Sequence, residues 1–504
     1  MFFVGLDIGT TSICGVLYDA LHDKVVRELH GENRFLEGAG FRQDPEEIVA
    51  AARRILEGLF ADGCLQGAES RPGGGEQSVR RTSNHSQQSL FRGEVLSLTQ
   101  ENAKIQHSPH GFESQRSCDM EVSGRRIGGI GISAQMHGIL YVNQEGNAVS
   151  PYYTWKNEWG GERYQTGKSY AEYLSEQTGM HLYAGYGSVT HFYLQKNGQI
   201  PAEAVSFVNI GDYLAMKLTG EKEALADVTI AASFGGFDLR RRQFALSVME
   251  KAGVDISYYP EVTEGKVMGT CQEIPVFGAV GDNQASFLGA VRDKEKSVSV
   301  NVGTGSQVSV FSEKLYETGK GEVRPFPGGG WLYVGASVNG GKVYERLAVF
   351  FKEMLAFFGA PVELAAVYEG MERLGREKEV TNLRVLPALY GERETVRGEE
   401  SAESGIWGLR EENFHGADLV RGFVSGMAEE LYDLYQGFPE ELRNGRTGIT
   451  ASGNGIRKNP LLREEIEKNW KLPVAFTDRE EEAATGAAVM AGILVGKEMD
   501  THEK

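Results

Sequence analysis

Two short β-hairpin patterns, about half a chain apart, constrain the fold of this sequence more than any other feature. The first has an apolar run at residues 2–6, the turn sequence DIGTT, and a second apolar run at residues 12–18. The second alternates at residues 297–302, turns at GTG, and alternates again at residues 306–311. Runs of this kind around a glycine-containing turn predict a hairpin. Two copies at this spacing suit a duplicated two-domain architecture, although Gly-Thr turns are common enough to leave duplication open.

The length and charge of the chain narrow the class of protein. Its 504 residues are too many for one hydrophobic core, so we expect at least two domains. Lys and Arg number 52 and Asp and Glu number 70, which gives a net charge of −18. This balance repels nucleic acid and anionic membranes at long range, so we expect neither as a partner.

The cysteines and the apolar runs indicate the compartment. The four cysteines lie far apart and form no CxxC pair: Cys14, Cys64, Cys118 and Cys271. This spacing argues against a disulfide framework or a thiolate metal site and suits a reducing cytosol. The first apolar run is interrupted by Asp7 and follows no basic stretch, so we expect no signal peptide. No run approaches the ~18 apolar residues of a membrane span, and we therefore expect a cytoplasmic protein.

Other segments give the organisation between the hairpins. Asp44 and Pro45 open a predicted helix with an apolar face. Residues 66–125 are rich in Ser, Gln, Asn and Gly, and we interpret them as a mobile surface insertion. Order is expected to resume with a strand at residues 127–133.

A third unit comes late in the sequence. It has a predicted strand at residues 447–451 and a glycine-containing loop at residues 452–458. Asn459 and Pro460 then cap and open a helix. A last helical stretch, rich in Ala and Gly, is predicted at residues 480–492.

Three segments carry candidate chemistry. The turn at residues 7–11 offers backbone N–H groups and hydroxyls beside a carboxylate, as anion-binding turns do, although a plain hairpin with a turn Asp gives the same pattern. The sequence contains no GxxxxGK[ST], which excludes a P-loop. Asp282 lies between an apolar run and a small-residue helix, where it can serve as a general base or only cap the helix. Residues 133–138 hold Gln135, Met136 and His137, which can contact a sugar, or His137 can be a structural residue.

Taken together, the motifs resemble those of the FGGY carbohydrate kinases. The runs occur in the family's order: DIGTTS at residues 7–12, QMHG at 135–138, GDNQ at 281–284, VGTGS at 302–306 and SGNG at 452–455. Within the family, QMHG, ASVNGG at 336–341 and LPALYGER at 386–393 resemble the sedoheptulokinase branch. The resemblance spans nearly the whole chain apart from the insertion.

The resemblance implies an α/β fold with two ribonuclease-H-like domains of the actin, hexokinase and Hsp70 ATPase type. We expect these domains at residues 1–275 and 276–504, with a central cleft. It implies that ATP and Mg²⁺ are used, with a small-molecule sugar as the partner, and homodimers remain open. The implied activity is phosphorylation of a primary hydroxyl of a ketose, with sedoheptulose as the first acceptor. Xylulose or another ketose or polyol is the alternative, and a non-catalytic ATP-gated or sugar-binding protein is the more distant one.

The family's roles transfer to individual residues of this sequence. Asp282 matches the catalytic base, which also contacts the sugar, and Asp7 matches the carboxylate near Mg²⁺. The remaining matches fall into three groups: Thr10 and Thr11 with Gly303 and Thr304 for the phosphates, Gly453 and Asn454 for the adenosine side, and Gln135, Met136 and His137 for the sugar.

One position departs from the family pattern. Relatives often carry Asp two residues after the Trp that matches Trp155, followed soon by Arg. Here Asn157 stands in that place and the next Arg is Arg163. Asn still donates and accepts hydrogen bonds but lacks the charge that would strengthen a bond to a sugar hydroxyl. The departure bears on the acceptor more than on the phosphoryl chemistry.

Overall fold

A computed structural model describes residues 1–38, 40–61, 121–122, 125–318, 321–391, 403–479 and 481–502. The expected insertion at residues 66–125 lies outside the described residues, except for its last few positions. Cys64, Cys118, Glu392 and Arg393 lie outside them as well. None of the helices in the described part of the chain combines the length and apolar character that a membrane crossing needs.

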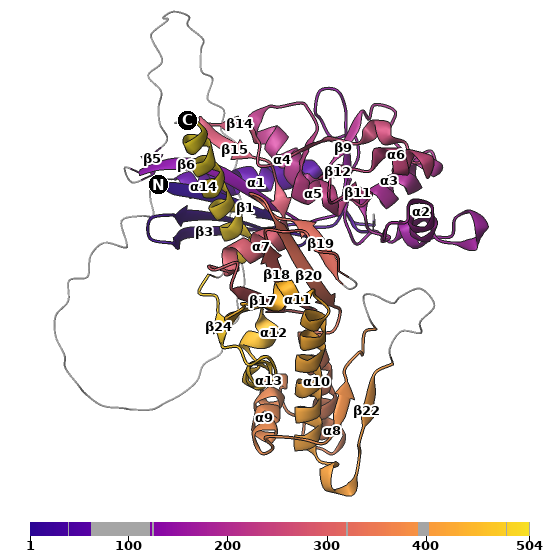
Figure 1. The fold of residues 1–504 in the computed structure, drawn as a ribbon, viewed down its shortest axis with the longest axis vertical. Coiled ribbons are helices and arrows are strands. Elements are labelled where there is room, and N and C mark those ends of the chain that lie inside the picture. The colour runs from indigo at the N-terminus through magenta and orange to yellow at the C-terminus, as the bar shows by residue number, and fades with distance from the viewer. Residues whose placement is uncertain are drawn as a thin grey trace, which may run out of the picture. The chain divides into compact units, whose positions relative to one another are not determined.

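The first sheet is built around the N-terminal hairpin (Figure 1). Strand β1 pairs antiparallel with β2 and parallel with β6, so its carboxyl end meets that of β6. The path of the sheet is β14 (Val267–Cys271), β15 (Ile274–Phe277), β6 (Arg125–Ala134), β1 (Phe2–Ile8), β2 (Ser12–Asp19) and β3 (Lys24–Glu32), with β5 (Glu121–Val122) and β16 (Val280–Gly281) beside β6.

The second sheet is built around the second hairpin, as the sequence predicts. Strand β17 pairs antiparallel with β18 and parallel with β23. The path of the sheet is β19 (Glu322–Pro325), β20 (Trp331–Ser337), β18 (Ser306–Ser312), β17 (Ser297–Val302), β23 (Gly448–Ser452) and β24 (Val474–Phe476).

The two sheets share one topology. In each, two parallel pairings (β15–β6–β1 and β24–β23–β17) are followed by two antiparallel ones (β1–β2–β3 and β17–β18–β20). The match extends to single positions, since Asp7 lies opposite Ser133 and Asn301 lies opposite Ser452. This common register supports the duplication that the hairpin spacing left open.

The helices follow the expected caps. The Oδ1 of Asp44 accepts hydrogen bonds from the N–H groups of Glu46 (2.8 Å) and Glu47 (3.3 Å) at the start of α1 (Pro45–Phe60). The Oδ1 of Asn459 accepts from the N–H of Leu462 (3.1 Å) at the start of α13 (Pro460–Trp470). Both caps satisfy N–H groups that the first helical turn leaves unpaired.

The remaining helices surround the two sheets. They are α2 (Tyr170–Thr178), α3 (Gly187–Lys196), α4 (Ile210–Thr219), α5 (Val228–Ser233), α6 (Leu246–Lys251), α7 (Asp282–Ala290), α8 (Gly341–Phe357), α9 (Leu364–Arg376), α10 (Gly416–Gln436), α11 (Glu440–Arg443), α12 (Asn454–Arg457) and α14 (Glu482–His502). Within the described ranges, four 3₁₀ turns add to these: Trp159–Gly161, Gln165–Gly167, Ile256–Tyr258 and Glu411–Asn413.

Five two-stranded pairs complete the described elements. They are β4 (Arg42–Gln43) with β8 (Tyr152–Tyr153), β7 (Leu140–Val142) with β9 (Ser206–Val208), β10 (Leu225–Asp227) with β13 (Glu261–Thr263), β11 (Phe237–Asp238) with β12 (Gln243–Phe244), and β21 (Arg384–Leu386) with β22 (Gly405–Trp407).

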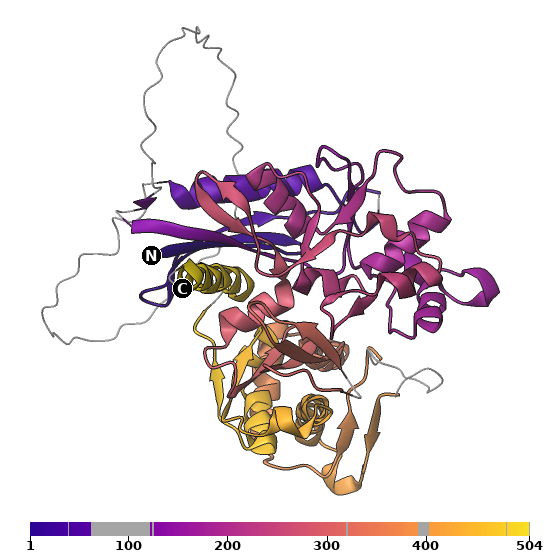
Figure 2. The ribbon, with the colours of Figure 1, turned by 45° about the horizontal axis from the view of Figure 1, so that its top comes forward.

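Two differences from the sequence prediction concern the C-terminal part. The expected loop at residues 452–458 contains the short helix α12, which its glycine-rich sequence concealed. The last helix, α14, extends ten residues beyond the predicted end at residue 492, to His502. Helix α14 packs against α7, β6 and β1, so the end of the chain returns to the first sheet (Figure 2). The division at residues 275 and 276 stays a prediction.

Candidate active site

Asp7 ends the apolar part of β1 and lies half-buried beside the first turn. The Ser133 hydroxyl on β6 donates a 2.8 Å hydrogen bond to its Oδ1. The pKa of Asp7 is raised to about 7, chiefly by burial and then by the negative charge of Asp282, which together outweigh the lowering effect of the Ser133 bond. Two carboxylates therefore lie close enough to oppose each other's ionisation.

Asp282 is the first residue of α7, and Gly281 occupies the capping position without a side-chain bond. The capping alternative for Asp282 is therefore wrong, because the helix already includes it. The pKa of Asp282 is raised to about 6, because burial outweighs the lowering effects of the Arg324 charge and the Asn283 N–H. A half-buried carboxyl with this pKa can accept a proton near neutral pH.

Arg324 is a residue that the sequence analysis missed. It lies on β19, is buried, and pairs with Glu322 two residues earlier on the same strand. Its Nη1 lies 3.7 Å from the Sδ of Met136, and its charge acts on Asp282. The second sheet thus supplies a cation to the carboxylate and to the expected sugar segment. An isolated Glu-x-Arg in a short strand gives no signal for this in the sequence.

The first Gly-Thr turn is held by side chains. Thr10 donates to the Oε1 of Gln135 (3.1 Å), and its Oγ1 accepts from the Nε1 of Trp155 (3.1 Å). The amide of Gln135 donates to Gln43 (2.9 Å), whose own amide donates to the Thr10 carbonyl (2.7 Å). Asn33 adds a bond to the Gly9 carbonyl (2.8 Å), and its N–H bonds to the carbonyl of the exposed Thr11 (3.0 Å).

His137 lies at a strained position after β6, with φ of 73°. Its backbone N–H donates to the Ser233 hydroxyl (3.0 Å), and its Nδ1 lies 2.6 Å from the Ser233 carbonyl. The ring stacks on Tyr186, with centroids 4.6 Å apart and planes inclined by 6°. These contacts fix the orientation of the ring. The Nδ1 of His137 therefore has the structural hydrogen-bonding role that the sequence analysis gave as an alternative.

Asn157 is buried in a local turn. Its Oδ1 accepts a hydrogen bond from the N–H of Trp159 (3.1 Å), and its own N–H bonds to the Thr154 carbonyl (3.0 Å). A carboxylate could accept the same bond, so the departure from the family pattern leaves this turn intact.

The second Gly-Thr turn is held by backbone packing. Gly303 accepts a 2.8 Å hydrogen bond from the N–H of Gly341, at the start of α8. A Cβ on Gly340 would lie 2.2 Å from the Gly305 carbonyl oxygen, and one on Gly453 would lie 2.5 Å from that of Val302. Gly453 also has φ of 86°, a conformation that favours glycine.

The predicted site residues fall into two groups. Asp7, Thr10, Gln135, Met136 and Asp282 lie around the carboxyl ends of β1 and β6. Gly303, Thr304, Gly453 and Asn454 lie at the ends of β17 and β23, with Thr304 and Asn454 exposed. The Nδ2 of Asn283 donates to the Oε1 of Gln307 (2.8 Å), which links α7 to the strand after the second turn.

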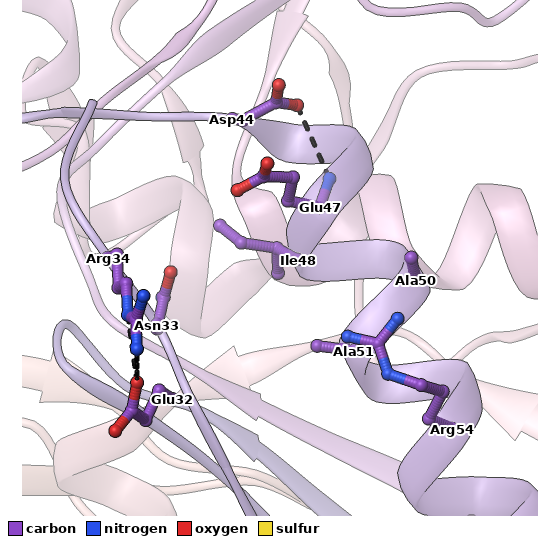
Figure 3. Close-up of a pocket in the computed structure, with 9 residues that line it drawn as sticks. All are labelled: Glu32, Asn33, Arg34, Asp44, Glu47, Ile48, Ala50, Ala51 and Arg54. Carbon is purple, nitrogen blue, oxygen red and sulfur yellow. Dashed lines mark hydrogen bonds and ion pairs between the residues drawn. The ribbon is translucent and has the colours of Figure 1, made fainter. Parts of the chain in front are cut away.

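A separate cavity of about 270 Å³ lies between the end of β3 and α1 (Figure 3). Its charged groups are largely occupied within the wall, since Arg34 pairs with Glu32 and Asp44 caps α1. None of the predicted site residues lines it, so we do not assign it to the substrate. The lining residues are Glu32, Asn33, Arg34, Asp44, Glu47, Ile48, Ala50, Ala51 and Arg54.

Known proteins are similar to this chain in sequence and in fold. Residues 100–289 match the FGGY family of carbohydrate kinases, N-terminal domain. A sedoheptulokinase of Mus musculus is 26% identical over 404 residues, covering 73% of this chain and 81% of the relative. That of Homo sapiens is 24% identical over 524 residues, covering 97% and 96%. A crystal structure of xylulose kinase from Rhodospirillum rubrum aligns with a TM-score of 0.72 at 18% identity, covering 98% of this chain and 90% of that one.

The chain is similar to the FGGY carbohydrate kinases, and its match to the N-terminal domain of that family confirms the resemblance that its motifs predict. It is an ATP-dependent sugar kinase, so ATP and a small sugar are its substrates. The expected fold class, with two ribonuclease-H-like α/β domains of the actin and hexokinase type, is confirmed.

Proposed function

We propose that this kinase transfers the terminal phosphoryl group of ATP to a primary hydroxyl of a ketose, with sedoheptulose giving sedoheptulose 7-phosphate as the first candidate. Similarity to two sedoheptulokinases, one over nearly the full length of both chains, supports this acceptor. The observation that carries the chemistry is the pair of half-buried carboxylates, Asp7 and Asp282, with Arg324 beside Asp282.

Asp282 is the general base of the proposed mechanism. Its pKa of about 6 leaves it ionised at neutral pH yet basic enough to take the proton of an attacking hydroxyl. Arg324 keeps this carboxylate ionised against burial, and it also positions Met136 at the expected sugar segment. Gln135, Met136 and His137 would line the acceptor side.

The carboxylate pair also fits a magnesium ion. Mg²⁺ prefers oxygen ligands and keeps several waters, so one carboxylate at the nucleotide side suffices. Asp7 would hold it, because burial and the negative charges of Asp282 and Glu481 raise the pKa of Asp7, and a cation would offset those charges. When bound, the ion would neutralise charge on the phosphates.

The remaining roles follow the two turns. Thr10 and Thr11 would bind the phosphates from one side and Gly303 and Thr304 from the other, with Gly453 and Asn454 toward adenosine. We place the division between the two lobes at residues 275 and 276, with the nucleotide side in the second lobe. A homodimer stays open as the assembly.

The test is sugar-stimulated ADP release by the purified chain with Mg²⁺ and ATP. Sedoheptulose, xylulose, ribulose and glycerol are compared with a blank that contains no sugar. We expect sedoheptulose to stimulate release most strongly. Asp282→Asn should lower kcat by at least about 100-fold while ATP binding is retained. Asp238→Asn, an exchange of the same chemistry on β11, is the control and should leave kcat unchanged.

Three outcomes would revise the proposal. Stimulation by xylulose alone would transfer the assignment to a xylulokinase. Unchanged turnover in Asp282→Asn would remove Asp282 as the base. Sugar binding with no sugar-dependent release of ADP would favour a non-catalytic sugar-binding protein, the alternative suggested by Asn157 in place of the family's Asp.

A further inference from the structure

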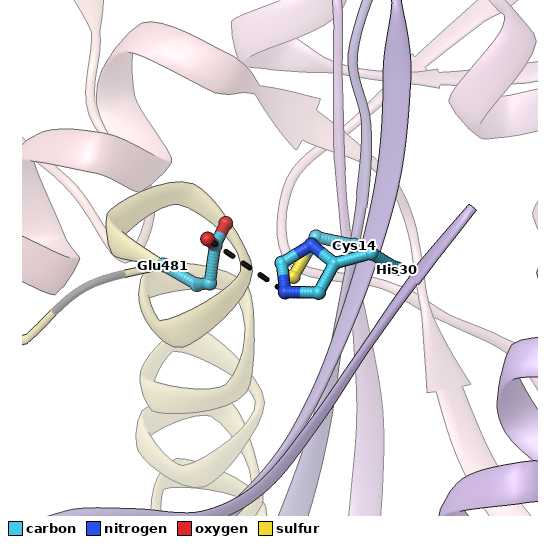
Figure 4. Close-up of side chains that lie close together, drawn as sticks. All are labelled: Cys14, His30 and Glu481. Carbon is cyan, nitrogen blue, oxygen red and sulfur yellow. Dashed lines mark ion pairs between the residues drawn. The ribbon is translucent and has the colours of Figure 1, made fainter. Parts of the chain in front are cut away.

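Three side chains of different elements converge beside the first hairpin, outside the proposed site residues. They are Cys14 on β2, His30 on β3 and Glu481 just before α14, and one potential ligand atom of each lies within 4.8 Å of the others (Figure 4). The spacing of the cysteines in the sequence gave no sign of this, because the three residues come from the two ends of the chain.

The sheet register fixes two of the three. Cys14 lies directly opposite His30 in the β2–β3 pair, and directly opposite Asp7 in the β1–β2 pair. Residues directly opposite each other in antiparallel strands point to the same face of the sheet. The thiol and the imidazole are therefore held on one face by backbone hydrogen bonds.

Helix α14 supplies the third group. It packs against β1 and β2, which brings Glu481 over the same face. The Nε2 of His30 lies 4.0 Å from the Oε1 of Glu481. Cys14 is 3% exposed, whereas the side chains of His30 and Glu481 are 51% and 36% exposed. The thiol thus lies at the buried end of a small site, and His30 and Glu481 lie at its solvent-exposed end.

The electrostatic surroundings favour a cation. Burial and the negative charges of Glu481, Asp7 and Glu28 all raise the pKa of the Cys14 thiol. The carboxylates of Asp7, Glu28 and Glu481 therefore all lie within electrostatic reach of this position. A divalent ion would offset their charges, displace the thiol proton and pair with the resulting thiolate.

We propose that Cys14, His30 and Glu481 form a binding site for a borderline-soft divalent transition metal such as Zn²⁺. The thiolate sulfur, a neutral imidazole nitrogen and a carboxylate oxygen are ligands that Zn²⁺ accepts, whereas Mg²⁺ prefers oxygen alone. One thiolate and one carboxylate balance the two positive charges of the ion. Binding breaks the S–H bond, forms the S–Zn bond and releases one proton to solvent, with no change in oxidation state.

The geometry needs only small adjustments. Ligand atoms around tetrahedral Zn²⁺ lie about 3.5 Å apart, and here the separations reach 4.8 Å at most. The half-exposed side chains of His30 and Glu481 can close this difference by rotation, while Cys14 stays fixed in the sheet. Three protein ligands leave a fourth position for water.

The test uses Co²⁺ alone as a spectroscopic probe of the metal-stripped, reduced full chain. One equivalent of Co²⁺ should give a thiolate-to-cobalt charge-transfer band, and Zn²⁺ should abolish it by displacement. Cys14→Ser should remove the band. His30→Ala and Glu481→Gln should each weaken Co²⁺ binding by about tenfold or more.

The control distinguishes the Cys14 thiol from the other cysteine in the described part of the chain. Cys271→Ser removes the other described cysteine, which lies on β14, and should leave the band unchanged. A band that persists in Cys14→Ser, or no band in the unmodified chain, would overturn the proposal. If Cys14→Ser fails to fold, His30→Ala provides the test, because the His30 side chain is half-exposed and its loss should not prevent folding. Unchanged Co²⁺ affinity in His30→Ala would also overturn the proposal.

A second measurement, thermal unfolding, does not depend on the charge-transfer band. One equivalent of Zn²⁺ should raise the Tm of the unmodified chain by mass action, and by more than the same concentration of Mg²⁺ does. His30→Ala should lose the Zn²⁺-dependent shift. An equal shift in His30→Ala would contradict the site.

Discussion

The two Gly-Thr hairpins share a register but differ in how their turns are held. The β1–β2 turn is fixed by side-chain hydrogen bonds from Gln43, Gln135 and Trp155. The β17–β18 turn is fixed by close backbone packing against the starts of α8 and α12. One sheet topology thus supports two kinds of turn, one adjustable by side-chain substitution and one dependent on the absence of side chains.

The hairpins also differ in charge at one matched position. Asp7 and Asn301 each precede the glycine of the turn by two residues, and each hydrogen bonds to a serine on the neighbouring parallel strand. Only the first hairpin carries a carboxylate there. At this matched position the first copy therefore holds an ionisable group, whereas the second holds a neutral amide.

The largest expected effect comes from adding a methyl group to the backbone-packed turn. In Gly340→Ala the new Cβ would lie 2.2 Å from the Gly305 carbonyl oxygen, so backbone must move. We expect a loss of about 3 kcal/mol or more in stability, measured by chemical unfolding. Gly303→Ala is the matched control for stability, because its nearest neighbour would be Asn301 at 3.9 Å. Equal losses in the two variants would contradict the packing argument.

The next effect comes from the side-chain network of the first turn. Gln135→Ala removes the acceptor of the Thr10 hydroxyl proton and the donor to the Oε1 of Gln43, so we expect a loss of about 2 kcal/mol in stability. A double-mutant cycle with Gln43→Ala should give a coupling of about 1 kcal/mol. Additive losses would show that the two amides act independently.

A smaller effect separates the charged position from its neutral counterpart. The ionised form of Asp7 is disfavoured in the fold, since its pKa is raised from 3.8 to about 7. The folded chain therefore binds more protons than the unfolded chain between these values, and stability falls as the pH rises through them. Asp7→Asn should raise Tm by about 1 to 3 °C at pH 8 without Mg²⁺, and by less at pH 5.

The reciprocal exchange checks this interpretation. Asn301→Asp places a carboxylate at the matched position of the second hairpin, so it should lower Tm more at pH 8 than at pH 5. A pH-independent change in either variant would show that charge is not its cause.

The smallest effect concerns the exposed tryptophan. Trp155→Phe removes the indole N–H that bonds to Thr10 but keeps an aromatic ring. We expect a loss below about 1 kcal/mol, because the threonine hydroxyl can take a water in its place. Chemical unfolding measures it, and a loss as large as that of Gln135→Ala would show that the indole contributes as much to the turn as the buried amide does.

The sequence predicted the parts of the fold that rest on local patterns. Both hairpins, the Asp44 and Asn459 caps and the strand before Gln135 are confirmed, because alternation and capping residues act over a few positions. Helix α12 was missed because it is only four residues long and contains Gly455, a poor helix former that close packing against Val302 favours at this position.

The site was predictable only where a motif marks it. Asp7 and Asp282 occur in recognisable runs, and the structure places them within electrostatic reach of each other. Arg324 and Glu481 carry no motif, since their positions near these carboxylates depend on how β19 and α14 pack. The sequence also left open whether Asp282 caps α7 or serves as a general base. Only the observed start of the helix, with Gly281 as its cap, removed the capping alternative.

The return of α14 to the first sheet has a consequence for how the protein is made. Strand β1 ends at Ile8 and α14 begins at Glu482, so nearly all of the described chain is synthesised before the sheet receives its cover. Backbone contact is close there, since a Cβ on Gly5 would lie 1.8 Å from the Ala484 carbonyl oxygen. During translation one apolar face of the N-terminal sheet therefore stays uncovered until α14 has been synthesised. Synthesis of α14, rather than emergence of the first strands, is the step that completes the sheet.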